Sequence, residues 1–210
     1  MCAKFGVDLD DTLYAFGDAV REEFFRMSVE KNDKSILKAA YAPFTEWRSL
    51  TDALEGDIIY EAILRVHDKA DEQTPFKGSA NTITELHKSG HEILYITSRL
   101  EKYYEATSKW LYFWGFPQSN NLLCVQGSKI PHVRDCKYLI DDRPETVVDF
   151  VTDSTWKRWS GITDPDRQRK AFGLWFPYNQ ALTDIKNVYL APNWFGIDYY
   201  LKRKGLIINE

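Results

Sequence analysis

The stretch GVDLDDTLY, residues 6–14, places Asp8, Asp10 and Asp11 within four positions, directly behind a short apolar segment. Three carboxylates at this spacing repel one another unless a cation lies between them. Asp8 and Asp10 are two residues apart, so at the end of a strand their side chains or backbone can converge on one point. Magnesium is a hard cation that prefers oxygen ligands and commonly takes one or two carboxylates from a protein. The stretch therefore predicts a strand that ends at a metal site.

The composition is that of a globular protein and argues against several classes. The chain has 210 residues, 44% of them hydrophobic, and a formal net charge of -4. This length suits one substantial α/β domain with a modest insertion, and the acidic balance argues against a nucleic-acid partner. Cys2, Cys124 and Cys136 show no paired spacing, which favours a reduced, cytoplasmic protein without disulfides or zinc. No apolar run reaches the ~18 to 20 residues of a membrane helix, so we expect no membrane partner.

Short apolar segments alternate with stretches of helical periodicity along the chain. Strands are expected at 4–9, 92–97, 121–125, 137–140 and 171–176, and helices at 78–90 and 101–117, which end at Gly90 and near Gly115. This alternation predicts an α/β fold with a Rossmann-like, mostly parallel sheet and helices on both faces. In such folds ligands bind beyond the carboxyl ends of the strands.

One interval interrupts the alternation. Residues 14–75 contain no convincing strand and are far too long for an ordinary connection. Their apolar residues recur three or four positions apart, which predicts helices. We therefore expect a small helical cap, residues 14–75, inserted after the first strand of a core domain formed by residues 1–13 and 76–210.

Polar residues follow the other expected strands as well. Asp141 and Asp142 end one of them and could supply further metal ligands. Either acidic pair alone could instead cap the next helix, but the two pairs together favour a metal site. Thr97 and Ser98 offer donors to a phosphate and Lys129 offers a positive charge, although a helix cap and an ordinary surface lysine are the alternatives.

The segments DLDDT, YITS, Lys129 and LIDD, in this order and at this spacing, resemble the four motifs of the haloacid dehalogenase superfamily. Over nearly its whole length the chain also resembles the 5'(3')-deoxyribonucleotidase family. The helical insert, the segment FPYNQAL at 176–182 and the closing segment NWFGIDYYLKRKG fall where that family has similar segments. The resemblance implies a Mg²⁺-dependent phosphatase that hydrolyses nucleoside monophosphates, deoxyribonucleotides preferred, through an aspartyl-phosphate intermediate.

The resemblance also implies roles for the acidic residues. Asp8 would be the nucleophile and a metal ligand. Asp10 would act as general acid and then as general base, and its backbone carbonyl would bind Mg²⁺. Asp142 would be a direct metal ligand, and Asp141 would help to orient the metal ligands without binding the metal itself.

Further roles concern the substrate. Thr97 and Ser98 would hold the phosphoryl oxygens, and Lys129 would stabilise the charge that nucleophile and phosphate share. Two positions depart from the family pattern: Asp11 stands where the family usually has Gly, and Arg99 where it tends to have Pro. A guanidinium at position 99 could add a phosphate or substrate contact.

Aromatic residues of the insert could line the substrate site. Phe16 matches the position of a family aromatic that packs on the nucleobase or sugar, with packing inside the cap as the equal alternative. Trp47 or Phe44 could form another wall, although for Trp47 packing is the favoured interpretation.

Three other functions compete with a nucleotidase. The segments TSRLEKYYEATSKWL and LIDDRPETVVDF also resemble the phosphatase domain of phage polynucleotide kinases, which would make the chain a polynucleotide 3'-phosphatase. The acidic balance and the large cap argue against it, because a nucleic-acid end needs an open, basic approach. A different small-molecule phosphomonoesterase of the superfamily is the second alternative. A binding protein without turnover is disfavoured, because all four motifs keep their chemical groups.

Overall fold

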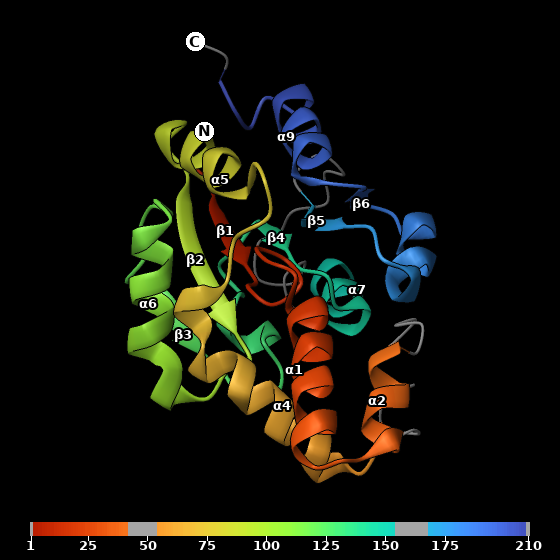
Figure 1. The fold of residues 1–210 in the computed structure, drawn as a ribbon. Helices are drawn as coiled ribbons and strands as arrows, with labels where there is room; N and C mark the ends of the chain where they lie inside the picture. The colour runs from red at the N-terminus through yellow and green to blue at the C-terminus, as the bar shows by residue number, and fades with distance from the viewer. Residues whose placement is uncertain (1, 42–53, 154–167, 209–210) are drawn as a thin grey trace.

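The computed structural model describes residues 2–41, 54–153 and 168–208 (Figure 1). Its six strands form one sheet in the order β3-β2-β1-β4-β5-β6, and every neighbouring pair is parallel. The strands are β1 (Lys4–Val7), β2 (Glu92–Thr97), β3 (Leu122–Cys124), β4 (Tyr138–Ile140), β5 (Lys170–Leu174) and β6 (Val188–Ala191). The expected α/β fold with a parallel sheet is confirmed.

The described helices follow the expected alternation. They are α1 (Phe16–Glu30), α2 (Lys34–Tyr41), α4 (Gly56–Asp68), α5 (Ser79–Lys88), α6 (Tyr104–Phe113), α7 (Pro144–Thr152) and α9 (Trp194–Arg203). Short 3-10 segments are η1 (Ala70–Glu72), η2 (Glu101–Tyr103), η3 (Ile130–His132) and η5 (Pro177–Asp184). Gly90 and Gly115 adopt positive φ angles of 86° and 76° just beyond α5 and α6, as is usual for glycines that end a helix.

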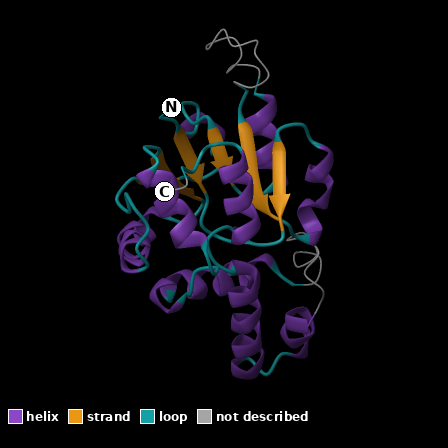
Figure 2. Cartoon of the chain, turned by 90° about the horizontal axis from the view of Figure 1, so that it is seen from above, coloured by secondary structure: helices purple, strands orange, loops and turns teal. Residues whose placement is uncertain are grey.

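Alternating side chains of the strands enter two different hydrophobic layers, because successive residues of a strand point to opposite faces. Tyr95 and Ile140 pack with residues of α5, α6 and α9 on one face, whereas Ile96 and Leu139 pack with residues of α7 on the other. Figure 2 shows the strands between these helices. The sheet is therefore buried on both faces, and its carboxyl edge remains for a site.

Strand β6 was not predicted. It is a four-residue edge strand whose two central residues are only half-buried. An edge position removes the continuous burial that makes the inner strands conspicuous in a sequence. The five predicted strands are all present, each within one residue of its expected start.

The insert is helical where the structure describes it. Helix α1 packs against α2 and α4, and in Figure 1 these helices lie beyond the carboxyl ends of the strands. The two ends of the insert meet: Tyr14 and Pro75 form an isolated antiparallel bridge, and the Phe76 amide donates to the Leu13 carbonyl at 2.7 Å. This closure is what the proposed division into cap and core requires.

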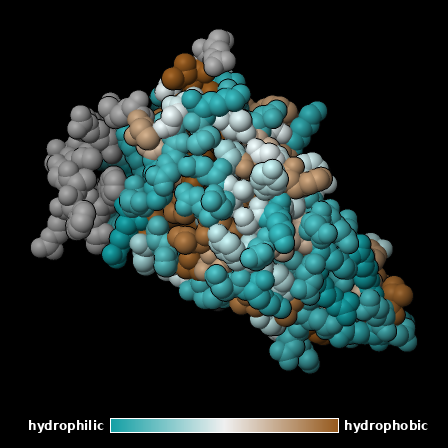
Figure 3. All heavy atoms as spheres, turned by 90° about the vertical axis from the view of Figure 1, so that its left-hand side faces the viewer, coloured by the Kyte–Doolittle hydropathy of each residue, from teal (hydrophilic) through white to brown (hydrophobic). Residues whose placement is uncertain are grey.

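None of the helices among the described residues is long and apolar enough to cross a membrane. Figure 3 shows the side of the molecule that is at the left in Figure 1, where hydrophobic side chains form small groups within a mostly hydrophilic surface. Two exposed aromatic residues, Tyr112 and Phe113, belong to α6.

A buried carboxylate connects the helices of the insert. Glu23 on α1 contacts Arg26 of the same helix at 3.1 Å, Arg65 of α4 at 3.3 Å and Lys69, directly after α4, at 3.0 Å. Burial would raise the pKa of Glu23, but the hydrogen bonds from Lys69 and Arg65 outweigh it and lower the pKa below its ordinary value of 4.5. The carboxylate therefore stabilises the insert only while it is ionised.

Replacing Glu23 by glutamine should lower the free energy of unfolding by about 1.5 to 3 kcal/mol at neutral pH. Because the folded-state pKa is lowered, this contribution is present above the ordinary pKa and is lost as the pH falls through the lowered value. Denaturant unfolding of both proteins at pH 7 and below pH 4 measures the difference, which should shrink in acid. Glu22→Gln, at the exposed neighbouring position, is the control. An equal loss at both pH values would contradict this account.

Candidate active site

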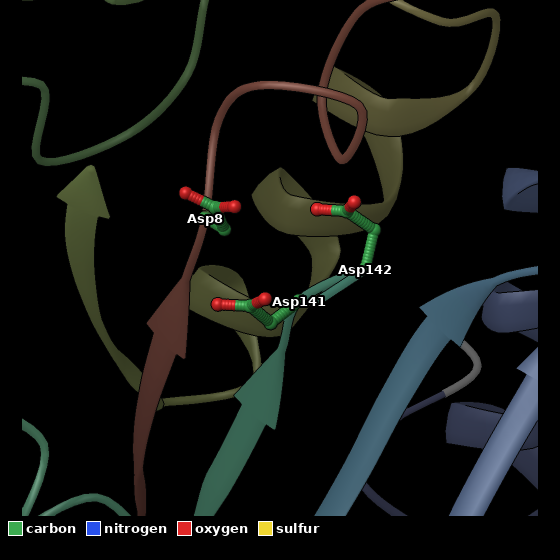
Figure 4. Close-up of side chains that lie close together, drawn as sticks. All are labelled: Asp8, Asp141 and Asp142. Atoms are coloured by element: carbon green, nitrogen blue, oxygen red, sulfur yellow. The ribbon is translucent and has the colours of Figure 1, made fainter. Parts of the chain in front are cut away.

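Three buried carboxylates lie together at the carboxyl edge of the sheet. Asp8 follows β1, and Asp141 and Asp142 follow β4, the adjacent strand. The three residues are 3%, 0% and 3% exposed, and one carboxylate oxygen from each lies within 4.8 Å of the others. Figure 4 shows these side chains directed toward a common space beyond the two strand ends.

The backbone holds the cluster in register. The Asp8 amide donates to the Ile140 carbonyl at 2.9 Å, and the Asp141 amide donates to the Phe172 carbonyl at 3.1 Å. Strand β5 approaches so closely that a Cβ at Gly173 would lie 2.7 Å from the Asp141 carbonyl oxygen. Only glycine permits this approach, so Gly173 is part of what positions Asp141.

The buried ammonium group of Lys129 faces two of the carboxylates. Lys129 Nζ lies 2.7 Å from Asp8 Oδ1 and 3.0 Å from Asp141 Oδ2. Burial would lower the pKa of Lys129, but Asp141 and Asp8 outweigh it and raise the pKa above its ordinary value. Lys129 is therefore a permanent cation at the base of the cluster rather than an ordinary surface lysine.

The cluster carries more negative charge than Lys129 balances. Burial raises the pKa of Asp8 well above its ordinary value despite the opposing effect of Lys129. Burial and the neighbouring Asp141 and Asp11 raise the pKa of Asp142 to about 7. Carboxylates that are this costly to ionise fit a further hard cation, and an all-oxygen donor set suits Mg²⁺. The residues that would hold it are Asp8 and Asp142, with Asp141 beside them.

The side chain of Asp10 points to a different group of partners. Its Oδ1 accepts hydrogen bonds from Arg99 Nη2 at 2.8 Å, Arg99 Nε at 3.1 Å and the Tyr14 hydroxyl at 2.7 Å. Burial would raise the pKa of Asp10, but the Arg99 guanidinium outweighs it and holds the pKa well below its ordinary value. The carboxylate of Asp10 is therefore ionised, and it lies apart from the three clustered carboxylates.

Arg99 is 2% exposed and faces protein groups. Besides Asp10, its nitrogens donate to Thr107 Oγ1 at 3.0 Å and to the Tyr14 hydroxyl at 2.7 Å. The sequence suggested a phosphate or substrate contact for this guanidinium. In the structure the guanidinium contacts the Asp10 carboxylate and lowers the pKa of that group.

Asp11 occupies the position where the resembled family usually has glycine, and the backbone explains that preference. Asp11 has a φ of 56°, in the left-handed region that favours glycine. Its side chain compensates by accepting a hydrogen bond from the Gly17 amide at 2.8 Å. Burial raises the pKa of Asp11 to about 7. The turn after Asp10 therefore keeps its left-handed conformation, because aspartate tolerates it better than most residues.

A cavity of about 590 Å³ opens above the carboxylates. Its walls come from the strand ends, the insert, the start of α7 and the segment after β5: Asp8, Asp10, Asp11, Phe16, Ile63, His67, Ser98, Lys129, Asp142, Arg143, Pro144, Glu145 and Tyr178. The predicted residues Asp8, Asp10, Asp142, Lys129, Ser98 and Phe16 thus share one cavity.

Thr97 does not line this cavity. Its side chain is buried, and its hydroxyl accepts a hydrogen bond from the Arg99 amide at 3.2 Å. Phe44 and Trp47 lie outside the described residues.

Several site residues escaped the sequence analysis. The Tyr178 hydroxyl donates to Asp142 Oδ2 at 2.6 Å, and Asn179 Nδ2 donates to the Asp142 carbonyl at 3.2 Å. Both belong to the segment FPYNQAL, which was noted only for its resemblance. His67 recurs four residues after Ile63 on α4, a helical spacing that places a polar group on the face turned to the cavity.

Comparison with solved structures identifies the fold. The chain is similar to a "HAD family hydrolase" from Deinococcus radiodurans with bound phosphate and sodium, with a TM-score of 0.56 and 12% identity over 99% of this chain and 98% of that one. A "putative phosphatase" from Clostridium difficile gives a TM-score of 0.60 and 14% identity over 95% of this chain and 98% of that one. The fold is that of the haloacid dehalogenase-like hydrolases.

Comparison with curated sequences identifies the family. A "putative nucleotidase" from Bacillus cereus is 30% identical over 170 residues, which cover 70% of this chain and 80% of that protein. A "putative nucleotidase" from Oceanobacillus iheyensis is 28% identical over 185 residues, 80% of this chain and 92% of that protein. The chain belongs to the same family as the Bacillus cereus protein. No protein-family model matches it.

Proposed function

We propose that this chain is a Mg²⁺-dependent nucleotidase similar to the 5'(3')-deoxyribonucleotidases, which releases phosphate from nucleoside monophosphates through an aspartyl-phosphate. The observation that carries the proposal is the contact of Lys129 with Asp8 beside Asp142, on the floor of a 590 Å³ cavity. A nucleophile, a permanent cation and a metal-binding carboxylate lie where one phosphoryl group can reach all three. The names of the curated relatives support the same substrate class.

Asp8 is the proposed nucleophile. Lys129 holds its Oδ1 at 2.7 Å, which leaves Oδ2 to attack phosphorus. The bond from Oδ2 to phosphorus forms as the bond from phosphorus to the ester oxygen breaks, and the alcohol leaves with one proton. Attack of water on phosphorus then breaks the bond to Asp8 and frees phosphate. Mg²⁺ held by Asp8 and Asp142 would neutralise charge on the phosphoryl oxygens.

Asp10 is the proposed proton carrier. Arg99 keeps it ionised in the free site, so the proton that it passes to the leaving oxygen arrives with the substrate, because phosphate monoesters carry a proton near pH 6. In the second step the ionised carboxylate accepts a proton from the attacking water. The backbone carbonyl of Asp10 is proposed as a further metal ligand.

The remaining predicted residues have supporting roles in the proposal. Ser98 lines the cavity and offers its hydroxyl and backbone to phosphoryl oxygens. Thr97 fixes the turn that carries Ser98 and Arg99, since its hydroxyl accepts the Arg99 amide. Both oxygens of Asp141 accept protein hydrogen bonds, from Lys129 at 3.0 Å and from the Arg143 amide at 2.9 Å. This suits a residue that orients the metal ligands without binding the metal itself.

A panel of phosphate esters tests the substrate class. Phosphate release is measured with Mg²⁺ for ribo- and deoxyribonucleoside 5'- and 3'-monophosphates, sugar phosphates and a 3'-phosphorylated oligonucleotide. We expect the highest kcat/KM for a deoxyribonucleoside monophosphate. Faster release from the oligonucleotide would show that the chain is a polynucleotide 3'-phosphatase instead. Faster release from sugar phosphates would contradict the nucleotide substrate and retain only the assignment as a phosphatase.

Tyr178→Phe tests the metal site. The Tyr178 hydroxyl donates to Asp142 Oδ2 at 2.6 Å and opposes the burial that raises the pKa of Asp142, so its loss favours the protonated carboxyl that cannot bind a metal. The Mg²⁺ concentration for half-maximal phosphate release should rise about 10- to 100-fold. EDTA should abolish release in both proteins, and added Mg²⁺ should restore it. Tyr199→Phe, at an exposed position on α9, should leave the Mg²⁺ dependence unchanged; an equal response of the two variants would contradict the assignment.

A further inference from the structure

A buried histidine of the insert lines the cavity beside Asp10. His67 on α4 is 5% exposed and lines the cavity, and its Nδ1 has no hydrogen-bond partner among the described residues. Its Nε2 lies 3.5 Å from Asp10 Oδ2, a contact that helps to lower the pKa of Asp10. Buried polar groups are nearly always hydrogen-bonded, and an unpaired one costs about 1 to 3 kcal/mol. A group supplied by a ligand in the cavity would remove this cost.

The ring of His67 is held in a fixed orientation. It stacks on Phe16, with ring centroids 5.1 Å apart and an interplanar angle of 22°, and its other neighbour Tyr103 makes an edge contact at 5.3 Å. Tyr103 is itself fixed to α4, because its hydroxyl donates to Asp68 at 2.8 Å. The imidazole is therefore an oriented donor or acceptor rather than a mobile side chain, as specific recognition requires.

The position of His67 indicates which part of a substrate it meets. In the proposed function the phosphoryl group lies beside Asp8 and Lys129, and the leaving oxygen points to Asp10. His67 lies on the insert, stacked on Phe16 and 3.5 Å from Asp10, whereas Lys129 contacts Asp8. A group beside His67 therefore belongs to the alcohol portion of the substrate and not to its phosphate.

We propose that His67 is a specificity-determining residue whose Nδ1 hydrogen-bonds a hydroxyl or carbonyl group on the alcohol portion of the substrate, beside the leaving oxygen. The inference rests on the proposed function, since it takes Asp8 and Asp10 as the groups that act on the phosphate. It assigns to α4 the recognition of a polar sugar or base. Phe16, stacked on the same imidazole, supplies the apolar wall next to that contact.

Two variants of His67 separate recognition from packing. His67→Phe keeps a ring against Phe16 and removes both nitrogens, and His67→Gln keeps a hydrogen-bonding side chain. Each is compared with wild type on two substrates: the hydroxyl-bearing ester that wild type hydrolyses best, from the nucleoside monophosphates and sugar phosphates, and p-nitrophenyl phosphate, whose leaving group has no hydroxyl. The ratio of the two kcat/KM values should fall about 10- to 100-fold in His67→Phe, mainly through KM, and recover in part in His67→Gln.

The controls make each outcome decisive. His87→Phe, at an exposed position on α5, should leave the ratio unchanged. Thermal unfolding shows whether His67→Phe is folded. An unchanged ratio in His67→Phe, or no recovery in His67→Gln when both are folded, overturns the inference. If the best substrate of wild type is a sugar phosphate, the nucleotide assignment fails but the His67 test stands; if wild type hydrolyses none of these esters, both fail.

Discussion

Replacing Asp8 by asparagine should abolish Mg²⁺-dependent phosphate release, with a loss of at least about 10⁴-fold in kcat. The amide is nearly the same size as the carboxylate but cannot attack phosphorus, so no covalent intermediate can form. Lys129 keeps its contact with Asp141 at 3.0 Å in the variant, so the buried ammonium group is not left without a counter-charge. A steady-state assay of phosphate release with the best substrate measures the effect.

The fold should survive this change. Burial raises the pKa of Asp8, which means that ionising this carboxylate in the folded protein is costly, and an uncharged amide removes that cost. We therefore expect the midpoint of thermal unfolding to be unchanged or higher. Asp149→Asn, at an exposed position on α7, is the matched control and should keep full activity. Unchanged turnover in Asp8→Asn would falsify the proposed nucleophile.

Replacing Arg99 by methionine should have the largest effect on stability. The guanidinium is buried and donates twice to Asp10 Oδ1, at 2.8 and 3.1 Å, so its removal leaves the half-buried carboxylate of Asp10 without its guanidinium partner. Breaking a buried ion pair in this way costs about 3 to 5 kcal/mol. The bonds to Thr107 and Tyr14 are lost as well. Denaturant unfolding at pH 7 measures the loss, and Arg134→Met, at an exposed position, is the control.

The pH dependence of the Arg99 effect has a definite sign. Arg99 holds the folded-state pKa of Asp10 well below its ordinary value of 3.8, so the pair stabilises the protein above that value and stops doing so as the pH falls through the lowered pKa. In Arg99→Met the carboxyl of Asp10 is protonated more readily. The difference between the two proteins should therefore be largest near neutral pH and shrink below about pH 4. A difference that is constant with pH would show that lost packing, and not the ion pair, accounts for the effect.

Local patterns predict the fold and the floor of the site well. Inner strands of a parallel sheet are continuous apolar segments, so β1 and β4 were located from sequence, and topology alone brings the residues that follow them to one edge. Asp8 and Asp142 could therefore be placed together in advance. The edge strand β6 could not, because its central residues are only half-buried.

The sequence could not predict the direction in which the site side chains point. Asp10 is two residues from Asp8, yet its carboxylate turns to Arg99, which is 89 residues away along the chain. Tyr178 and His67 reach the site from η5 and α4. The spacing from Ile63 places His67 on one face of α4, but how these segments pack decides that this face meets the site. Residues that meet only through tertiary contacts leave no trace in spacing or periodicity.

The insert leaves the core and returns to it at nearly one point, since the Phe76 amide bonds the Leu13 carbonyl and Tyr14 pairs with Pro75. We therefore expect that a different set of helices, or a short turn, can replace this segment between the same two neighbours without disturbing the order of the strands. In the proposed function the phosphate chemistry belongs to the core and the choice of substrate to the insert, so we expect that one can be redesigned while the other is retained.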